Sequence, residues 1–168
     1  MSVDVSSLTI EKALSIAYKS EIEAENTYKK LKKKVNNFVL KDKLQFLIHE
    51  EKKHQKLLEA LYKKMFDGKG ISPAEKSLLP KLDIALHEET LVPDLLEMAV
   101  EMEKISEEFY DTLSEEIEDR SVQDILQYLA SMEHGHYFLL KGELELCQRD
   151  EMYYDRDDFQ YDMIHIGP

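Results

Sequence analysis

The sequence predicts an all-α protein, an antiparallel four-helix bundle built from two helical hairpins, with a long crossover between the second and third helices. Apolar residues recur at helical spacing through four long segments, which is typical of amphipathic helices that bury one face. Only five Gly and four Pro occur in 168 residues, so few turns interrupt these helices. One sequence pattern also occurs twice, 82 residues apart, which indicates one hairpin written two times, enough to close a bundle.

The duplicated pattern is a lone glutamate followed, 30 residues later, by a Glu-x-x-His pair. Six residues form the two copies: Glu21, Glu51, His54, Glu103, Glu133 and His136. Residues three apart project from the same side of an α-helix, so the Glu and His of each pair can bind one metal ion together. The two lone glutamates would come from the other two helices and either bridge two ions or cap them. Together these residue types form the ligand set of a two-metal carboxylate site inside a helix bundle.

The chemistry of this ligand set narrows the choice of metal. Carboxylate oxygen and imidazole nitrogen suit iron, manganese or zinc, whereas the absence of thiolates disfavours copper(I) and iron–sulfur clusters. Four carboxylates also balance two divalent cations in formal charge. The glutamates stand at core spacing in otherwise apolar stripes, and no Lys or Arg lies in those stripes to neutralise them. A buried metal centre is therefore predicted, and coincidental surface glutamates are the alternative.

Capping residues and glycines set the boundaries of the first hairpin. Thr9 is an N-cap candidate for a first helix that runs to about residue 35, and the asparagines at 36–37 form a tight break. A second helix is expected at about 39–65, because the glycine-containing segment 67–70 stops it.

The connection and the second hairpin are predicted in the same way. Residues 72–75 read Ser-Pro-Ala-Glu, the order of a capping box with Pro at the first helical position, so a short helix is expected there, ended by Pro80. The third helix is expected at about 93–117 and the fourth at about 121–149.

Connection lengths determine the topology. Short joints make each hairpin antiparallel, whereas the connection at about 67–92 can span the length of the bundle, since extended chain covers over ~3 Å per residue. The same length permits exchange of hairpins between two chains, and the sequence leaves this alternative open. We expect one domain at 1–149 and a C-terminal tail at 150–168, whose aromatic and apolar residues indicate packing on the bundle or on a partner chain.

Composition excludes several classes of function. A net charge of −13 disfavours nucleic-acid binding and anionic membrane surfaces. No apolar run approaches the ~20 residues of a membrane span, and the N-terminus lacks the features of a signal peptide. The single cysteine, Cys147, excludes an internal disulfide, so we expect a location in the reducing cytoplasm.

Two tyrosines and a stretch of sequence extend the pattern beyond the six glutamates and histidines. Tyr28 and Tyr110 each follow a lone glutamate by seven residues, and the third segment reads Ala-Val-Glu-Met-Glu-Lys at 99–104 and Glu-Phe-Tyr at 108–110. With these features the sequence resembles the rubrerythrin branch of the ferritin-like superfamily over about residues 10–149. The resemblance implies a ferritin-like bundle with two iron ions held by the six residues, a reaction with peroxide or dioxygen, and tyrosines that hydrogen-bond beside the centre.

The sequence also departs from typical rubrerythrins. These carry a C-terminal rubredoxin module with four cysteines, so a chain with one cysteine would need an external electron donor, such as a separate rubredoxin. They also have a further glutamate three residues after the third-helix ligand, where this chain has Ser106. A six-ligand centre is closer to a bacterioferritin-type ferroxidase site.

The sequence therefore predicts a cytoplasmic non-haem di-iron oxidoreductase, expected to be a homodimer. One alternative is a protein that handles or stores iron at the same centre without a reductive cycle. The other is a bundle in which the metal only holds the fold. Two further histidines, His49 and His134, flank the ligands but are expected on the surface by helical period.

Overall fold

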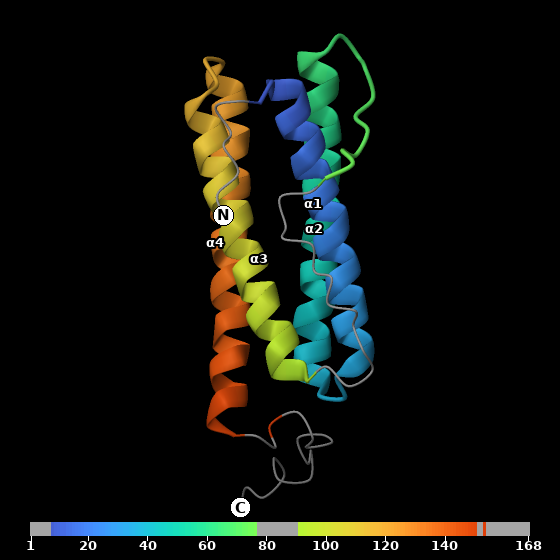
Figure 1. Cartoon of the computed structure of the whole chain (residues 1–168), viewed down its shortest axis with the longest axis vertical. Coiled ribbons are helices and arrows are strands. Elements are labelled where there is room, and N and C mark those ends of the chain that lie inside the picture. The colour runs from blue at the N-terminus through green and yellow to red at the C-terminus, as the bar shows by residue number, and fades with distance from the viewer. Residues whose placement is uncertain (1–7, 77–90, 151–152, 154–168) are drawn as a thin grey trace, which may run out of the picture.

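The computed structural model describes residues 8–76, 91–150 and 153, and this part of the chain contains four α-helices and no strand (Figure 1). The helices are α1 (Ile10–Lys34), α2 (Phe38–Met65), α3 (Val92–Glu115) and α4 (Arg120–Arg149). Their ends lie close to those predicted from capping residues and glycines. None of these described helices is long and apolar enough to cross a membrane.

The four helices form the predicted bundle of two antiparallel hairpins, α1 with α2 and α3 with α4 (Figure 1). Helices α2 and α3 run in the same direction, so the chain between them returns along the length of the bundle, as in ferritin-like folds. The middle of that connection, residues 77–90, lies outside the described residues.

Side chains cap the helices where the sequence offers them. Thr9 accepts a hydrogen bond from the first turn of α1, as predicted, and Asn37 and Asp119 do the same for α2 and α4. The glycine stop of α2 is also confirmed. Gly68 has a φ of +81° and its N–H donates to the carbonyl of Lys63 at 2.8 Å, a conformation that glycine adopts without strain.

The short helix expected from residue 72 is wrong for the described part of that segment. Residues 72–76 are not helical. Instead, the N–H of Ala74 donates to the carbonyl of Ser15 in α1 at 3.1 Å, and Pro73 has no N–H to offer. This hydrogen bond holds the segment against α1.

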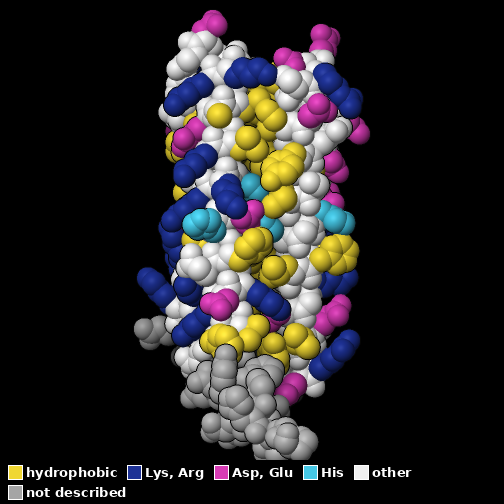
Figure 2. Space-filling view, turned by 180° about the vertical axis from the view of Figure 1, so that it is seen from behind, with side chains coloured by type: hydrophobic (Ala, Val, Ile, Leu, Met, Phe, Trp, Pro, Cys, Tyr) yellow, Lys and Arg dark blue, Asp and Glu magenta, His cyan; other side chains and the backbone are white. Residues whose placement is uncertain are grey.

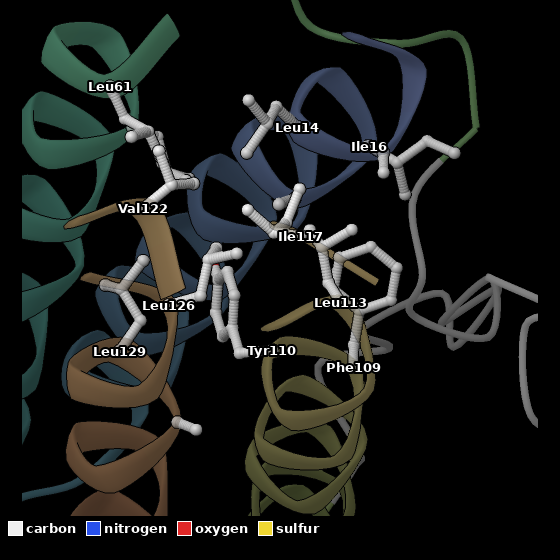
Figure 3. Packing of buried hydrophobic residues seen from close by; sticks show 14 of the residues in the cluster. Leu14, Ile16, Leu61, Phe109, Tyr110, Leu113, Ile117, Val122, Leu126 and Leu129 are labelled. Carbon is white, nitrogen blue, oxygen red and sulfur yellow. The ribbon is translucent and has the colours of Figure 1, made fainter. Parts of the chain in front are cut away.

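Two apolar clusters fill the bundle, one toward each end. The first includes Leu14, Leu61 and Leu126, with Tyr110 in its lower layer (Figure 3). The second includes Leu44 among residues of all four helices. The predicted ligands lie between them, because the apolar periodicity of every helix is interrupted by acidic residues at its middle.

Only one residue of the C-terminal tail beyond Asp150, Tyr153, is among the described residues, and it packs on the bundle as predicted. Tyr153 packs against the second apolar cluster, and its carbonyl accepts a hydrogen bond from Nδ2 of Asn37 at 3.5 Å. The rest of the tail, residues 151–152 and 154–168, lies outside the described residues.

Candidate metal centre

The six glutamates and histidines of the duplicated pattern come together in the middle of the bundle. Helix α1 contributes Glu21 and α3 contributes Glu103, while each Glu-x-x-His pair comes from α2 or α4. All six are at most 2% exposed. No Lys or Arg contacts any of the six in the described structure, so the acidic layer has no basic side chain other than histidine.

The layer consists of two overlapping groups of four. One group is Glu21, Glu51, His54 and Glu133, and the other is Glu51, Glu103, Glu133 and His136. Within each group the potential ligand atoms lie within 4.8 Å of one another. Two residues, Glu51 and Glu133, belong to both groups. The sequence left open whether the lone glutamates bridge or cap, and this arrangement favours capping, because each lone glutamate belongs to one group.

Several atoms of the layer have hydrogen-bonding capacity that no described residue uses. Both ring nitrogens of His136, Nε2 of His54 and Oε1 of Glu103 are buried without a hydrogen-bond partner in the described structure. Buried polar atoms in proteins are nearly always paired, so unpaired atoms that converge from α2, α3 and α4 fit metal ions. The imidazole rings of His54 and His136 lie stacked, with centroids 5.4 Å apart.

The protein-family model that matches the chain is Rubrerythrin, over residues 12–144. The chain belongs to the rubrerythrin family. It is similar to a hypothetical protein from Pyrococcus furiosus, with 36% sequence identity, a TM-score of 0.80, and coverage of 87% of this chain and 94% of that one. It also shares its fold with a Thermotoga maritima protein described as a ferritin-like diiron-carboxylate protein, at 17% identity, a TM-score of 0.67, and coverage of 86% and 97%. No curated protein matches the chain.

The carboxyl groups of this rubrerythrin-family centre differ in their affinity for protons. Burial, with the nearby charge of Glu133, raises the pKa of Glu21 and of Glu103 well above the ordinary value. Burial also acts to raise the pKa of Glu51 and of Glu133. Contacts with the imidazole rings of His136 and His54 outweigh it at Glu51, and contacts with Glu103 and the same two rings outweigh it at Glu133, so both pKa values are lowered. Without metal, the two lone glutamates therefore bind protons more readily than the two shared glutamates.

The two histidines of the metal-free centre also favour their protonated forms. Burial acts to lower the pKa of His136, but its contacts with Glu103, Glu133 and Glu51 outweigh that effect and raise the pKa to about 12. The pKa of His54 is raised by the corresponding contacts. Protonation of the two imidazole rings thus offsets negative charge of the shared carboxylates in the metal-free centre.

The two predicted tyrosines are both buried, but they differ in their contacts. The hydroxyl of Tyr110 donates a short hydrogen bond to Glu21. The hydroxyl of Tyr28, its repeat equivalent, has no hydrogen-bond partner among the described residues. Ser106, at the position of the additional glutamate of typical family members, is buried on α3 and adds no carboxylate to the layer.

Sequence reasoning missed the role of Phe46. Its ring is 48% exposed, yet it meets the ring of His136 edge-on, with centroids 6.3 Å apart. Figure 2 shows the corresponding face, where histidine and acidic side chains are visible within a band of apolar ones between α2 and α4. The repeat equivalent of Phe46 is Tyr128, which is also exposed. The duplicated pattern had paired the two residues, but only the packing of α2 beside α4 brings Phe46 to a predicted ligand.

Outside the layer, Glu25 connects the centre to the surface of α1 and α2. Its carboxylate lies 2.5 Å from Lys29 and 3.7 Å from Lys52 and accepts a hydrogen bond from Gln55 at 2.8 Å. Gln55 also donates to the carbonyl of Glu21 at 3.4 Å. The structure thus buries Glu25 beside the centre.

The histidines predicted to lie on the surface do so. His49 and His134 are exposed, which confirms the prediction from helical period. His134 lies 2.8 Å from Glu107, the repeat equivalent of Glu25.

Proposed function

We propose that this protein is a non-haem di-iron oxidoreductase that reduces hydrogen peroxide, or dioxygen, with electrons from a separate donor. The observation that carries the proposal is the pair of overlapping groups with Glu51 and Glu133 in common. Two ions held side by side by shared carboxylates suit the transfer of two electrons to one small molecule. Membership of the rubrerythrin family, and a structural relative described as a diiron-carboxylate protein, favour iron over manganese or zinc.

The six residues would hold the metal as two sites. One site would use Glu21 and His54, the other Glu103 and His136, and both would use the shared glutamates Glu51 and Glu133. Two ferrous ions would supply the two electrons that, with two protons, convert one peroxide molecule to two water molecules.

The remaining residues set the conditions for this reaction. The apolar clusters on either side of the layer exclude bulk water, which strengthens the electrostatic interactions inside it. The hydroxyl of Tyr110 holds a proton against Glu21 and thereby fixes the orientation of that carboxylate. The shared carboxylates remain ionised, because their pKa values are lowered, and so offer negative charge to both ions.

A second candidate is iron oxidation or storage without a reductive cycle. Ser106 favours it, because the position where typical family members carry a further glutamate has no carboxylate here. A centre of six ligands is then closer to a ferroxidase site than to a typical rubrerythrin centre.

Stopped-flow oxidation of the anaerobic ferrous protein distinguishes these functions. We expect a rapid spectral change on addition of peroxide, followed by peroxide consumption that requires an added donor. Net accumulation of iron without turnover would support iron handling, and the absence of a rapid change would leave a structural role for the metal. Steady peroxide removal without a donor would instead support a catalase-like dimanganese centre, which elemental analysis would identify.

Variants of the shared glutamates provide the control. Glu51→Ala and Glu133→Ala each remove a ligand from both groups, so each should abolish rapid oxidation. Glu97→Ala changes an exposed glutamate of α3 and should leave oxidation unchanged. Oxidation at the wild-type rate in both shared-glutamate variants would show that the chemistry takes place elsewhere.

A further inference from the structure

The duplication offers an internal comparison between the outer surfaces of the two hairpins. Positions that flank the centre carry lysine in the first hairpin, but the equivalent positions of the second hairpin do not. The pairs, 82 residues apart, are Lys29 with Asp111, Lys52 with His134, Lys53 with Gly135, and Lys56 with Phe138. We call the four lysines the basic patch. All four are exposed.

The charge of the two hairpins is divided in the same way. Residues 10–65 contain 14 Lys against 8 Asp and Glu, a net charge of +6, whereas residues 92–149 contain 4 Lys and Arg against 15 Asp and Glu, a net charge of −11. In Figure 2, dark blue side chains gather along the side of the molecule where α2 lies. Solvation alone requires only that charges of either sign cover a surface, so this separation indicates a positive surface on an otherwise acidic protein.

The basic patch lies beside the metal centre. Lys52 and Lys53 are located in the sequence between Glu51 and His54, which point inward. Lys52 also contacts Glu25, which Gln55 connects to the backbone of Glu21. A molecule bound to the patch would therefore be separated from the centre only by helices α1 and α2.

We propose that the basic patch is the docking site of an acidic one-electron carrier protein, which reduces the metal centre through the first hairpin. This inference rests on the proposed function, since that reaction needs a donor. Two one-electron transfers from the carrier would balance the reduction of one peroxide, and the carrier would be oxidised by one electron in each. Charge complementarity selects an acidic partner, because opposite charges accelerate encounter and orient the two proteins.

The test uses the iron-loaded protein, with a reduced rubredoxin of net negative charge as the probe. The variant Lys52→Gln/Lys56→Gln removes two charges of the patch but leaves Lys29 on Glu25. We expect the second-order rate of reduction by rubredoxin to fall about tenfold at low salt and to lose most of its dependence on ionic strength. Lys52→Arg/Lys56→Arg retains the charge and should restore the wild-type rate.

A matched control separates the patch from overall charge. Lys30→Gln/Lys63→Gln removes two exposed lysines from the same hairpin, near its two ends, and should react with rubredoxin as the wild type does. Equal rates for the patch and control variants would overturn the docking site. A patch variant that changed only self-association, or only binding to an RNA oligonucleotide, would also overturn it, in favour of a second copy or of nucleic acid.

The small donor dithionite distinguishes failure of docking from failure of the proposed function. At high ionic strength, which screens the charge of this small anion, dithionite should reduce the wild type and both variants at the same rate, and peroxide should reoxidise all three. If peroxide failed to oxidise the wild-type ferrous protein, the proposed function and the docking site would both be wrong. If these reactions took place but rubredoxin reduced all variants equally, only the docking site would be wrong.

Discussion

Metal binding should release protons, because the metal-free centre holds protons on the residues that the ions need. We expect that loading the protein with two divalent ions at pH 7 will release protons, up to about four when both lone glutamates and both histidines give up one each. Ferrous iron can be replaced in this measurement by Zn²⁺ or Co²⁺, which bind the same kinds of ligand without oxidation.

The magnitude follows from the charge state of the layer. Burial raises the pKa values of the two lone glutamates, which favours their protonated form, and each protonated one gives up a proton when it becomes a ligand. The two histidines carry an extra proton because their contacts with glutamates raise their pKa values, and each gives up one more. The shared glutamates are already ionised and release none. The logarithm of the product of the two binding constants should therefore rise by up to about four per pH unit near pH 7.

Isothermal titration calorimetry in buffers with different ionisation enthalpies measures the number of protons released. The variant Glu21→Gln provides the control, because an amide carries no titratable proton at this position, and it should reduce the release by up to about one proton. A wild-type release close to zero would refute the reasoning, since it would mean that the lone glutamates are ionised and the histidines neutral without metal.

The stability of the metal-free protein should have the opposite dependence on pH. The lone glutamates and the histidines have pKa values raised above 4.5 and 6.5, so the folded state binds more protons than the unfolded state above pH 4.5, and stability falls as pH rises. The shared glutamates have lowered pKa values, so their contribution is lost as pH falls below 4.5. Thermal melts with a chelator should show a maximum near pH 4.5, and a metal-free protein that is most stable above pH 7 would contradict this assignment.

Three substitutions test other contacts of the structure. Phe46→Ala uncovers the ring of His136, so a chelator should remove metal from this variant severalfold faster than from the wild type. Tyr128→Ala changes the repeat equivalent and should have a much smaller effect on the rate of metal removal. Equal rates for the two variants would mean that the ring of Phe46 does not shield the centre. Tyr110→Phe should retain both metal ions but change the oxidation rate, measured by stopped flow. It should also lower the free energy of unfolding by about 1 kcal/mol, measured by denaturant unfolding. Loss of a metal ion from this variant would mean that Tyr110 is needed for metal binding itself. Lys43→Ala removes the lysine of the ion pair with the buried carboxylate of Glu143 and should cost about 1 kcal/mol, because the lysine is partly exposed. Lys43→Ile with Glu143→Leu copies the apolar residues of the other half of the repeat and should be more stable than Lys43→Ala in the same unfolding assay.

The parts of the structure that depend on local geometry could be predicted from the sequence. The caps and stops formed by Thr9 and Gly68 involve backbone groups only a few residues away. The same holds for the Glu-x-x-His pairs, because three residues along a helix always return to the same side. The duplicated spacing then implied that four helices bring six such residues together, without any knowledge of how the helices pack.

A local rule failed where a distant part of the chain competed. Residues 72–75 have the order of a helix start, but the N–H of Ala74 donates instead to Ser15, a residue 59 positions earlier. Similarly, the ion pair of the buried Glu143 with the partly exposed Lys43 joins α4 to α2, and nothing in the sequence near either residue indicates the other.

By itself, the sequence determined the fold class and the six residues of the centre, because periodicity and repeat spacing are properties of single helices and of their order. Only the tertiary structure decided which glutamates are common to both groups. The sequence treats Glu21 and Glu51 alike as acidic residues at core spacing, but the relative height and rotation of the four helices place Glu51 and Glu133 within both groups and Glu21 in one. Those offsets between helices arise from the packing of side chains that are far apart in the sequence.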